Sequence, residues 1–147
     1  MNLSTGLRNL LIGTSGTAGF SGIFSTNSFM DLYTAIPLHA DYHETSGGGV
    51  FIASITRDGQ GTCLSFGTAG SGGILSKSSD VWRGTAASGG ACPGQLAYYR
   101  MYGPGKVTGS SNTAVRFDGT IGVGTYIITP GSSVTIPTAT FTILESS

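Results

Sequence analysis

The chain has 147 residues, the size of one ordinary domain, and 39% of them are hydrophobic, which argues for a single folded core and against disorder. Only 10% are charged, with seven basic and seven acidic residues, so no net field would attract a nucleic acid. The sequence has neither the run of about 18 apolar residues that a membrane span needs nor the pattern of a secretory signal. We therefore expect a soluble, unexported protein with a weakly charged, hydroxyl-rich surface.

The first nineteen residues differ in pattern from the rest of the chain. Four leucines recur at spacings of three and four, which predicts a short amphipathic helix capped by Ser4 or Thr5 and ending before Gly13. The glycine-rich stretch that follows is typical of a connector. We expect an N-terminal arm and connector over residues 1–19 and a folded domain over residues 20–147. The leucines of the arm are Leu3, Leu7, Leu10 and Leu11.

The middle of the chain alternates between short extended runs and turn residues. Pro37 closes the first run because proline cannot donate a hydrogen bond to a strand ladder. Asp58-Gly59 predicts a type I′ hairpin, since both residue types tolerate positive φ, and the chain is expected to return antiparallel after it. The strands predicted here are residues 29–35, 50–56, 62–67 and 74–77.

The second half continues the same pattern. Alternation along residues 113–121 predicts that Val115 and Phe117 point inward and that Arg116 and Asp118 point outward. Residues 95–102 have tyrosines on both faces, and we expect this strand to be central in its sheet. The strands predicted here are residues 80–85, 95–102, 113–121, 124–129 and 132–144.

The last of these segments contains a change of parity. Apolar residues fall on even positions up to Ile136 and on odd positions from Ala139, with Pro137 between them. Because side chains alternate with a period of two, the change predicts a bulge or bend at Pro137 or Thr138, where one strand crosses between two sheets. The fold class expected is all-β, a single β-sandwich or jelly-roll-like domain of roughly nine short antiparallel strands with a short N-terminal helical arm.

Candidate chemical motifs are few, and each has a simpler interpretation. His39, Asp41, His43 and Glu44 are the one cluster of potential metal ligands, but they follow a proline, precede a glycine run and have no third histidine or cysteine nearby, so a solvated loop is favoured. The segment 103–108 lacks the glycine and the hydroxyl residue of a phosphate-binding loop. We predict no catalytic, cofactor-binding or metal-binding residues, and no enzyme activity.

Two further groups of residues have alternative interpretations. Four aromatic side chains could either stack against a sugar or pack in the core or an interface. Packing is the commoner role for aromatics spaced as they are along a strand. Cys63 and Cys92 are compatible with one disulfide, although two separate thiols are favoured. The aromatics in question are Trp82, Tyr98, Tyr99 and Tyr102.

The order of several segments resembles a family of small β-rich structural proteins encoded among the virion genes of tailed bacteriophages. The segments are FMDLYTA, FIASITRDG, CLSFG, GGILSKSSDVWRGTA, AYYRMYG and VRFDGTIG, and the likeness spans residues 3–144. It implies a non-enzymatic virion protein, made in the host bacterial cytoplasm. The His39 to Glu44 loop matches no part of that family's pattern.

The resemblance leaves two structural roles open. In the first, the protein is a capsid decoration or cement protein that binds the outer head, contacts the major capsid protein and forms a homo-oligomer such as a trimer. The leucines of the N-terminal arm would then contact the partner. In the second, it is a tail or fibre-associated module that contributes to recognition of host-surface glycans, and the four aromatics would matter. Neither role implies a cofactor, a nucleic acid or a membrane.

Overall fold

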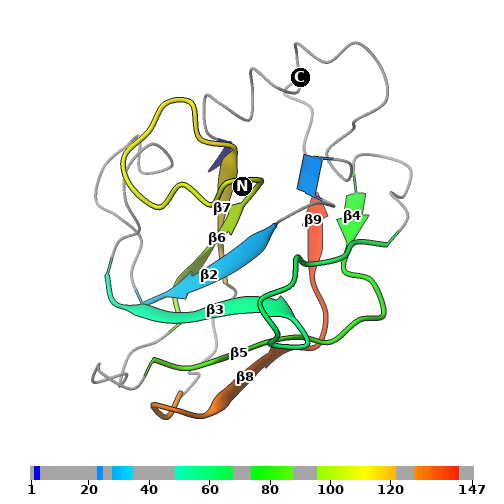
Figure 1. Cartoon of the computed structure of the whole chain (residues 1–147), viewed down its shortest axis with the longest axis vertical. Coiled ribbons are helices and arrows are strands. Elements are labelled where there is room, and N and C mark those ends of the chain that lie inside the picture. Colours follow the sequence, from blue (N-terminus) through cyan, green and yellow to red (C-terminus); the bar gives the residue numbers. More distant parts are fainter. Residues whose placement is uncertain are drawn as a thin grey trace.

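The fold is all-β, as predicted, in the part of the chain that the structure describes (Figure 1). This computed structural model describes residues 2–3, 23–24, 28–34, 49–67, 74–87, 96–121 and 128–142. Within these ranges no helix is long and apolar enough to cross a membrane. The strands are β1 Asn2–Leu3, β2 Phe29–Tyr33, β3 Phe51–Arg57, β4 Ile74–Ser76, β5 Trp82–Thr85, β6 Tyr98–Tyr102, β7 Arg116–Thr120, β8 Ser133–Ile136 and β9 Thr140–Thr142.

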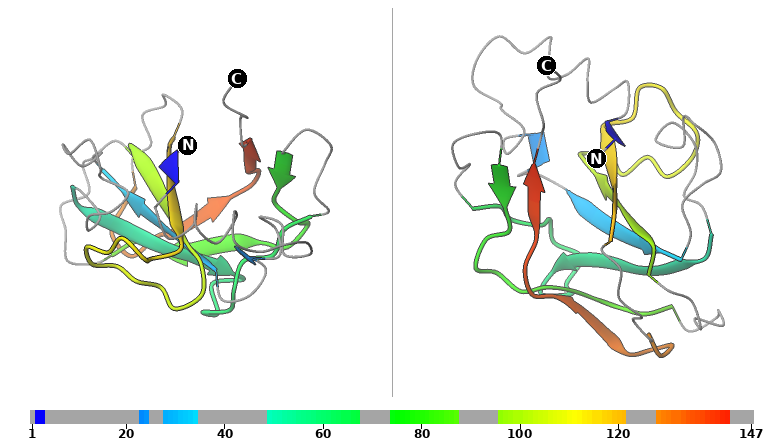
Figure 2. Two further views of the ribbon diagram at one scale, coloured as in Figure 1. Left: turned by 90° about the horizontal axis from the view of Figure 1, so that it is seen from above. Right: turned by 180° about the vertical axis from the view of Figure 1, so that it is seen from behind.

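The main sheet has the strand order β1-β7-β6-β2-β3-β5-β8, and β4 and β9 form a separate pair. All of these pairings are antiparallel. Strand β6 lies between β7 and β2, so the prediction that this segment is central is confirmed. Figure 2, seen from above, shows the main sheet strongly curved, with β6 and β7 on one side and the β4–β9 pair on the other.

The predicted turn at the end of β3 is confirmed, but the strand expected after it is not, and the bridge across the turn joins Arg57 to Thr62 with four residues between them. Asp58 and Gly59 have φ values of 55° and 68°, and the Gln60 N–H donates to the Arg57 carbonyl at 3.1 Å, as a type I′ turn requires. Residues 62–67 then form only isolated bridges, because the chain leaves β3 at once and bridges to Lys77 near β4. On that side β3 is paired with β2, from Ile55 opposite Met30 onward, while β5 pairs with the other edge of β3.

The predicted break near Pro137 is also confirmed. Strand β8 ends at Ile136 in the main sheet, and β9 begins at Thr140 in the smaller pair, so one stretch of chain contributes to both. Side-chain burial follows the change of parity, since Ile136 is half-buried in β8 and Phe141 is buried in β9.

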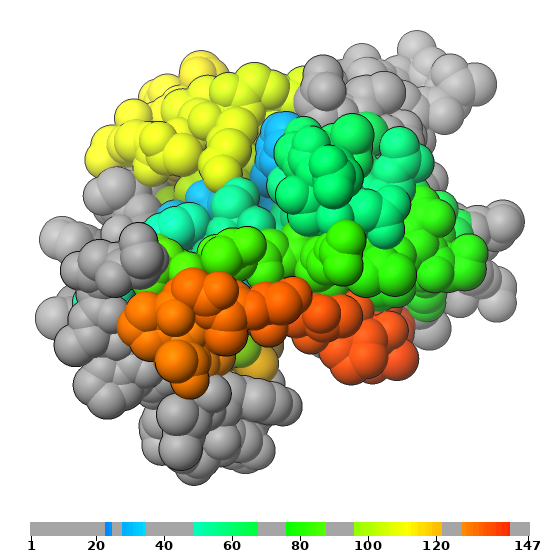
Figure 3. All heavy atoms as spheres, turned by 60° about the horizontal axis from the view of Figure 1, so that its bottom comes forward, coloured from blue at the N-terminus to red at the C-terminus, as the bar shows by residue number. Residues whose placement is uncertain are grey.

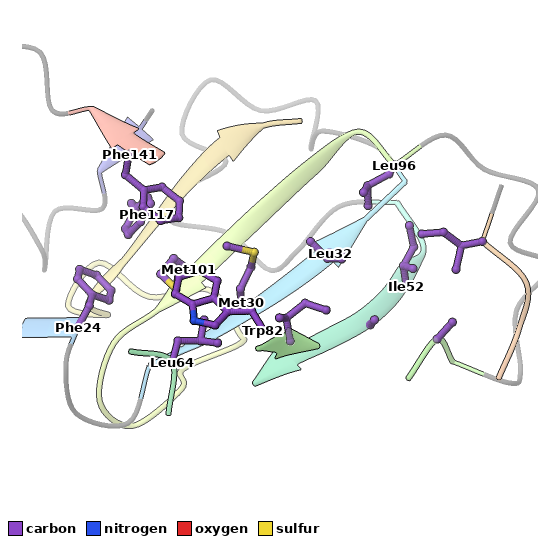
Figure 4. Packing of buried hydrophobic residues seen from close by; sticks show 14 of the residues in the cluster. Phe24, Met30, Leu32, Ile52, Leu64, Trp82, Leu96, Met101, Phe117 and Phe141 are labelled. Atoms are coloured by element: carbon purple, nitrogen blue, oxygen red, sulfur yellow. The ribbon is translucent and has the colours of Figure 1, made fainter. Parts of the chain in front are cut away.

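The hydrophobic core lies on the concave face of the main sheet. Alternate residues of β2, β3, β6 and β7 contribute to it, and Phe141 of β9 packs against them from the other side. Its ring centre lies 5.5 Å from that of Phe117 and 5.7 Å from that of Tyr99, in edge-to-face geometry. Figure 4 shows Phe117 and Phe141 together at one end of the cluster.

The start of the chain departs from the sequence-based expectation. Leu3, predicted to be the first apolar residue of a helix, lies instead in β1, which pairs with β7 through Asn2–Asp118 and Leu3–Phe117. A free edge of β7 accounts for this, because an extended segment satisfies its backbone hydrogen bonds. Leu7, Leu10 and Leu11 lie outside the described residues, as do the arm boundary at residue 19 and the predicted strand at 124–129.

Gly84 permits the close approach of β5 to β3, which gives a testable prediction. A Cβ atom at this position would overlap the backbone carbonyl oxygen of Ser54 and lie 3.2 Å from Ile55 Cδ1. Gly84→Ala should therefore lower the free energy of unfolding by about 1–3 kcal/mol, the usual effect of overpacking. Gly109→Ala is the matched control, because a Cβ there meets open space. Equal urea midpoints for the two variants would contradict the close approach.

Candidate functional site

The convex face of the main sheet contains a row of charged and tyrosine side chains where a solvated surface would be expected. The register aligns Asp31 of β2 with Arg100 of β6 and Asp118 of β7, and all three are buried. We call this group the buried network. Its members are Asp31, Tyr33, Ser54, Tyr98, Arg100, Tyr102, Lys106, Arg116 and Asp118.

Arg100 and Asp118 form the centre of the buried network. Arg100 Nε donates to Asp118 Oδ1 and Arg100 Nη2 to Asp118 Oδ2, each at 2.7 Å, and both side chains are fully buried. Two parallel hydrogen bonds of this kind are the strongest geometry for the pair. Burial by itself lowers the pKa of Arg100, but the hydrogen bonds and charge of Asp118 outweigh it and raise that pKa. The Arg100 guanidinium is therefore held in its charged form.

Lys106 joins a loop to the network. Its Nζ lies 2.9 Å from Asp31 Oδ1 and 2.9 Å from Ser54 Oγ, and 5.6 Å from the ring centres of both Phe29 and Tyr102. The Asp31 carboxylate is almost fully buried, whereas Lys106 is about one-third exposed. The lysine thus enters from the solvent side and neutralises a carboxylate that the sheet has buried.

Arg116 fixes the same loop, residues 103–115, over the convex face. Its guanidinium donates to the carbonyl oxygens of Val107 at 3.0 Å and Gly109 at 2.7 Å, and more weakly to that of Ser111 at 3.4 Å. Arg116 and Asp118 lie on the face opposite Phe117, as the alternation predicts, but both are fully buried instead of meeting solvent. Their face is buried because this loop folds back across it.

Three tyrosines complete the network: Tyr33 and Tyr98 lie opposite each other at one end of the β2–β6 ladder, and Tyr102 lies at the other end. The rings of Tyr33 and Tyr98 stack with centres 5.0 Å apart, and the hydroxyls of Tyr33 and Tyr102 lie 3.3 Å from each other. Burial raises the pKa of both Tyr33 and Tyr102, so these hydroxyls stay protonated at neutral pH.

Tyr99 lies on the opposite, concave face and gives a prediction about alkaline pH. Burial, with a smaller contribution from the charge of Asp118, raises the pKa of Tyr99 to about 12. An unfolded chain releases this proton near pH 10, so folding stability should be complete below about pH 10 and fall as the pH rises to about 12. Tyr99→Phe should reduce that fall, measured as urea midpoints at pH values on either side of 10. An unchanged slope would show that Tyr99 does not contribute.

The four aromatics considered as a glycan platform lie in different places. Trp82 and Tyr99 lie on the concave face, while Tyr98 and Tyr102 belong to the buried network. Trp82, Tyr98 and Tyr102 are each at most 1% exposed, so their rings are not open to a sugar in this chain. The burial of these three rings agrees with the interpretation that they pack within the fold.

No protein family, curated protein or solved structure matches this chain. The resemblance to phage structural proteins therefore stays a hypothesis.

Several other candidate residues lie outside the described part of the chain, including Cys92 and the loop with His39, Asp41, His43 and Glu44. Cys63 is described and is half-buried. Among the described residues, no group of three or more histidine, cysteine or acidic side chains is arranged to hold a metal ion.

A second polar cluster lies at the turn before β5. Ser65 Oγ contacts Asp80 Oδ2 and lies 2.6 Å from Ser78 Oγ, and Arg57 Nη1 lies 3.7 Å from the same carboxylate. The Ser65 hydrogen bond, followed by the charge of Arg57, lowers the pKa of Asp80. This cluster connects the segment after the turn at Asp58-Gly59 to the turn before β5.

The buried network was not predicted from the sequence. One signal was present, because Asp31, Arg100 and Asp118 each interrupt an apolar or aromatic strand. The interactions within the buried network are those of a structural element. Each buried carboxylate has a cation at hydrogen-bond distance, and the Arg116 guanidinium donates to carbonyl oxygens. Such a network favours one register and one loop position.

Proposed function

We propose that this protein is a non-enzymatic structural protein of a tailed-phage virion, most favourably a capsid decoration protein that binds the outer head and stabilises it. The resemblance of the strand segments to phage structural proteins supports the virion role. The low charge and small size of the chain suit a permanent component of an assembly. The partner would be the major capsid protein, and the site of action the virion after assembly in the host cytoplasm.

One observation carries the non-enzymatic part of this proposal. The ionisable side chains that the sheet brings together are used within the fold, as Arg100 with Asp118 and Lys106 with Asp31. General acid–base catalysis needs such groups to face a substrate, and a buried, neutralised pair does not. The burial of Trp82, Tyr98 and Tyr102 likewise gives the tail-associated, glycan-binding alternative less support.

The proposal extends to the layer arrangement. A β-sandwich or jelly-roll would have the curved main sheet as one layer and the strands around β4 and β9 as the other. Its support is the packing of Phe141 from β9 against Phe117 and Tyr99 of the main sheet, across a shared core.

Copy number in purified particles tests the virion role. Quantitative mass spectrometry of particles from the host whose genome encodes this chain should find it in numbers comparable to the major capsid protein. A number as small as that of a tail fibre would overturn the decoration role, and absence from the particles would overturn the virion role altogether.

The N-terminal arm supplies a second test. Leu7→Ser combined with Leu10→Ser should weaken binding to capsids that lack the protein, because the proposed arm contact is apolar. The thermal midpoint of the isolated protein should stay unchanged. A variant that binds capsids as well as the original chain would remove the arm from the proposed contact.

A further inference from the structure

Strand β8 lies at one end of the main sheet, paired with β5 on one side only. Figure 3 shows it at the surface in orange, along the border of β5 in green. Ser133 and Thr135 are exposed on its convex face, while Val134 and Ile136 are half-buried on the concave face. An edge strand presents a row of backbone donors and acceptors that can pair with another strand.

The register shows which backbone groups face that open edge. The Ala86 N–H donates to the Ser132 carbonyl at 2.9 Å, and hydrogen-bonded pairs alternate along an antiparallel ladder. The pairs bonded to β5 are therefore Gly84–Val134 and Trp82–Ile136. The N–H and C=O groups of Ser133 and Thr135 point the other way, where the described part of the chain places no strand.

The chemistry of this edge favours a second copy of the same chain as the occupant. Natural edge strands usually carry charges that discourage pairing, but no charged residue or histidine occurs between Asp118 and Glu145. A groove of about 700 Å³ borders β8, and its described lining, which includes Met30, Leu32 and Tyr99, is also uncharged. The whole chain has zero net charge, so two copies do not repel each other.

We propose that two copies pair antiparallel through β8 about a twofold axis at Val134. Side chains opposite each other must share a face, which places Val134 opposite its own symmetry mate and Ser133 opposite Thr135 of the second copy. This register joins the outward N–H and C=O groups of Ser133 and Thr135 in four backbone hydrogen bonds. It also brings two Val134 side chains together beside the groove. Pro137, which lacks an N–H, limits the ladder at its end.

This contact gives a dimer, and it deepens the proposed function by naming a homo-oligomer interface. Its tests use the purified chain alone, so either proposal can fail without the other. Analytical ultracentrifugation should show a concentration-dependent dimer. A monomer at every soluble concentration would overturn the inference.

Cross-linking tests the register. Residues opposite each other in a non-hydrogen-bonded pair have Cα atoms about 4.5 Å apart, within the range that a disulfide spans. Under mild oxidation, Val134→Cys should therefore form more covalent dimer than the original chain does. Thr85→Cys, exposed on the neighbouring β5, is the matched control and should not. Equal cross-linking of the two variants would overturn the twofold at Val134.

Charge substitution tests the same contact without a covalent bond. Ser133→Glu with Thr135→Glu places like charges opposite each other across the axis and should raise the dissociation constant at least about tenfold. Ser133→Lys with Thr135→Glu places opposite charges there and should retain the dimer. Both positions are exposed, so the fold should tolerate either pair of changes. Identical dissociation constants for the two double variants would overturn the proposed pairing.

Discussion

Replacing Asp118 with asparagine should lower the free energy of unfolding by about 3–5 kcal/mol, because it removes the carboxylate charge that is paired with the fully buried Arg100 guanidinium. The amide has nearly the shape of the carboxylate, so the loss reports charge rather than a cavity. Arg100 cannot escape the cost by releasing a proton, since its pKa is high even in water. Urea denaturation measures the effect as a lower midpoint with an unchanged slope.

A double replacement separates the cost of breaking the pair from the value of having it. Arg100→Met with Asp118→Leu removes both charges and keeps most of the volume, and it should recover most of the stability that Asp118→Asn loses. A loss below about 1 kcal/mol for Asp118→Asn would contradict the full burial of this pair. A double variant no more stable than the single one would assign the loss to packing or to other contacts of these two residues.

The strands that could be predicted are those whose pattern is local. β2, β3 and β6 follow from short extended runs, and the Asp58-Gly59 turn follows from the two residue types that tolerate positive φ. The break at Pro137 follows from the change of parity alone. Each of these features depends on neighbours within a few residues, which a sequence displays directly.

The candidate site could not be predicted in the same way, because it depends on residues far apart in the chain. Lys106 and Asp31 are separated by 75 positions, and nothing local to Asp31 indicates that a loop will supply its cation. Alternation along β7 correctly placed Phe117 in the core, but it assumed that the other face meets water. The loop 103–115 covers that face, and its position depends on Arg116 itself.

The segment after this turn shows the same limit. A type I′ turn normally returns the chain beside the strand it left, yet only Thr62 bridges to β3, because β2 occupies that side from Ile55 onward. The competing interactions are again distant: Leu64 N–H donates to the Ser28 carbonyl at 3.0 Å, and the Leu64 side chain is buried in the core. Tertiary burial thus overrides the local preference.

Replacing Trp82 with alanine should lower the free energy of unfolding by about 3–5 kcal/mol, the range for loss of a large aromatic from a core. Trp82 is fully buried, and its ring centre lies 5.3 Å from that of Phe66 and 6.4 Å from that of Phe141. Alanine would leave a cavity between these two rings. Far-UV circular dichroism should follow the urea transition, because Trp82 is the single tryptophan and the variant has no indole fluorescence.

Comparing Trp82→Phe with Trp82→Ala tests the contribution of the indole N–H. In the described part of the chain, Trp82 Nε1 is a buried donor with no hydrogen-bond partner, an arrangement that costs about 1–3 kcal/mol. Phenylalanine removes that donor and keeps most of the aromatic contact with Phe66 and Phe141, so the relief should offset part of the lost volume. We expect Trp82→Phe to cost less than half of what Trp82→Ala costs. Equal losses would show that the Nε1 proton has a partner in solution, such as a bound water, whose hydrogen bond the substitution also removes.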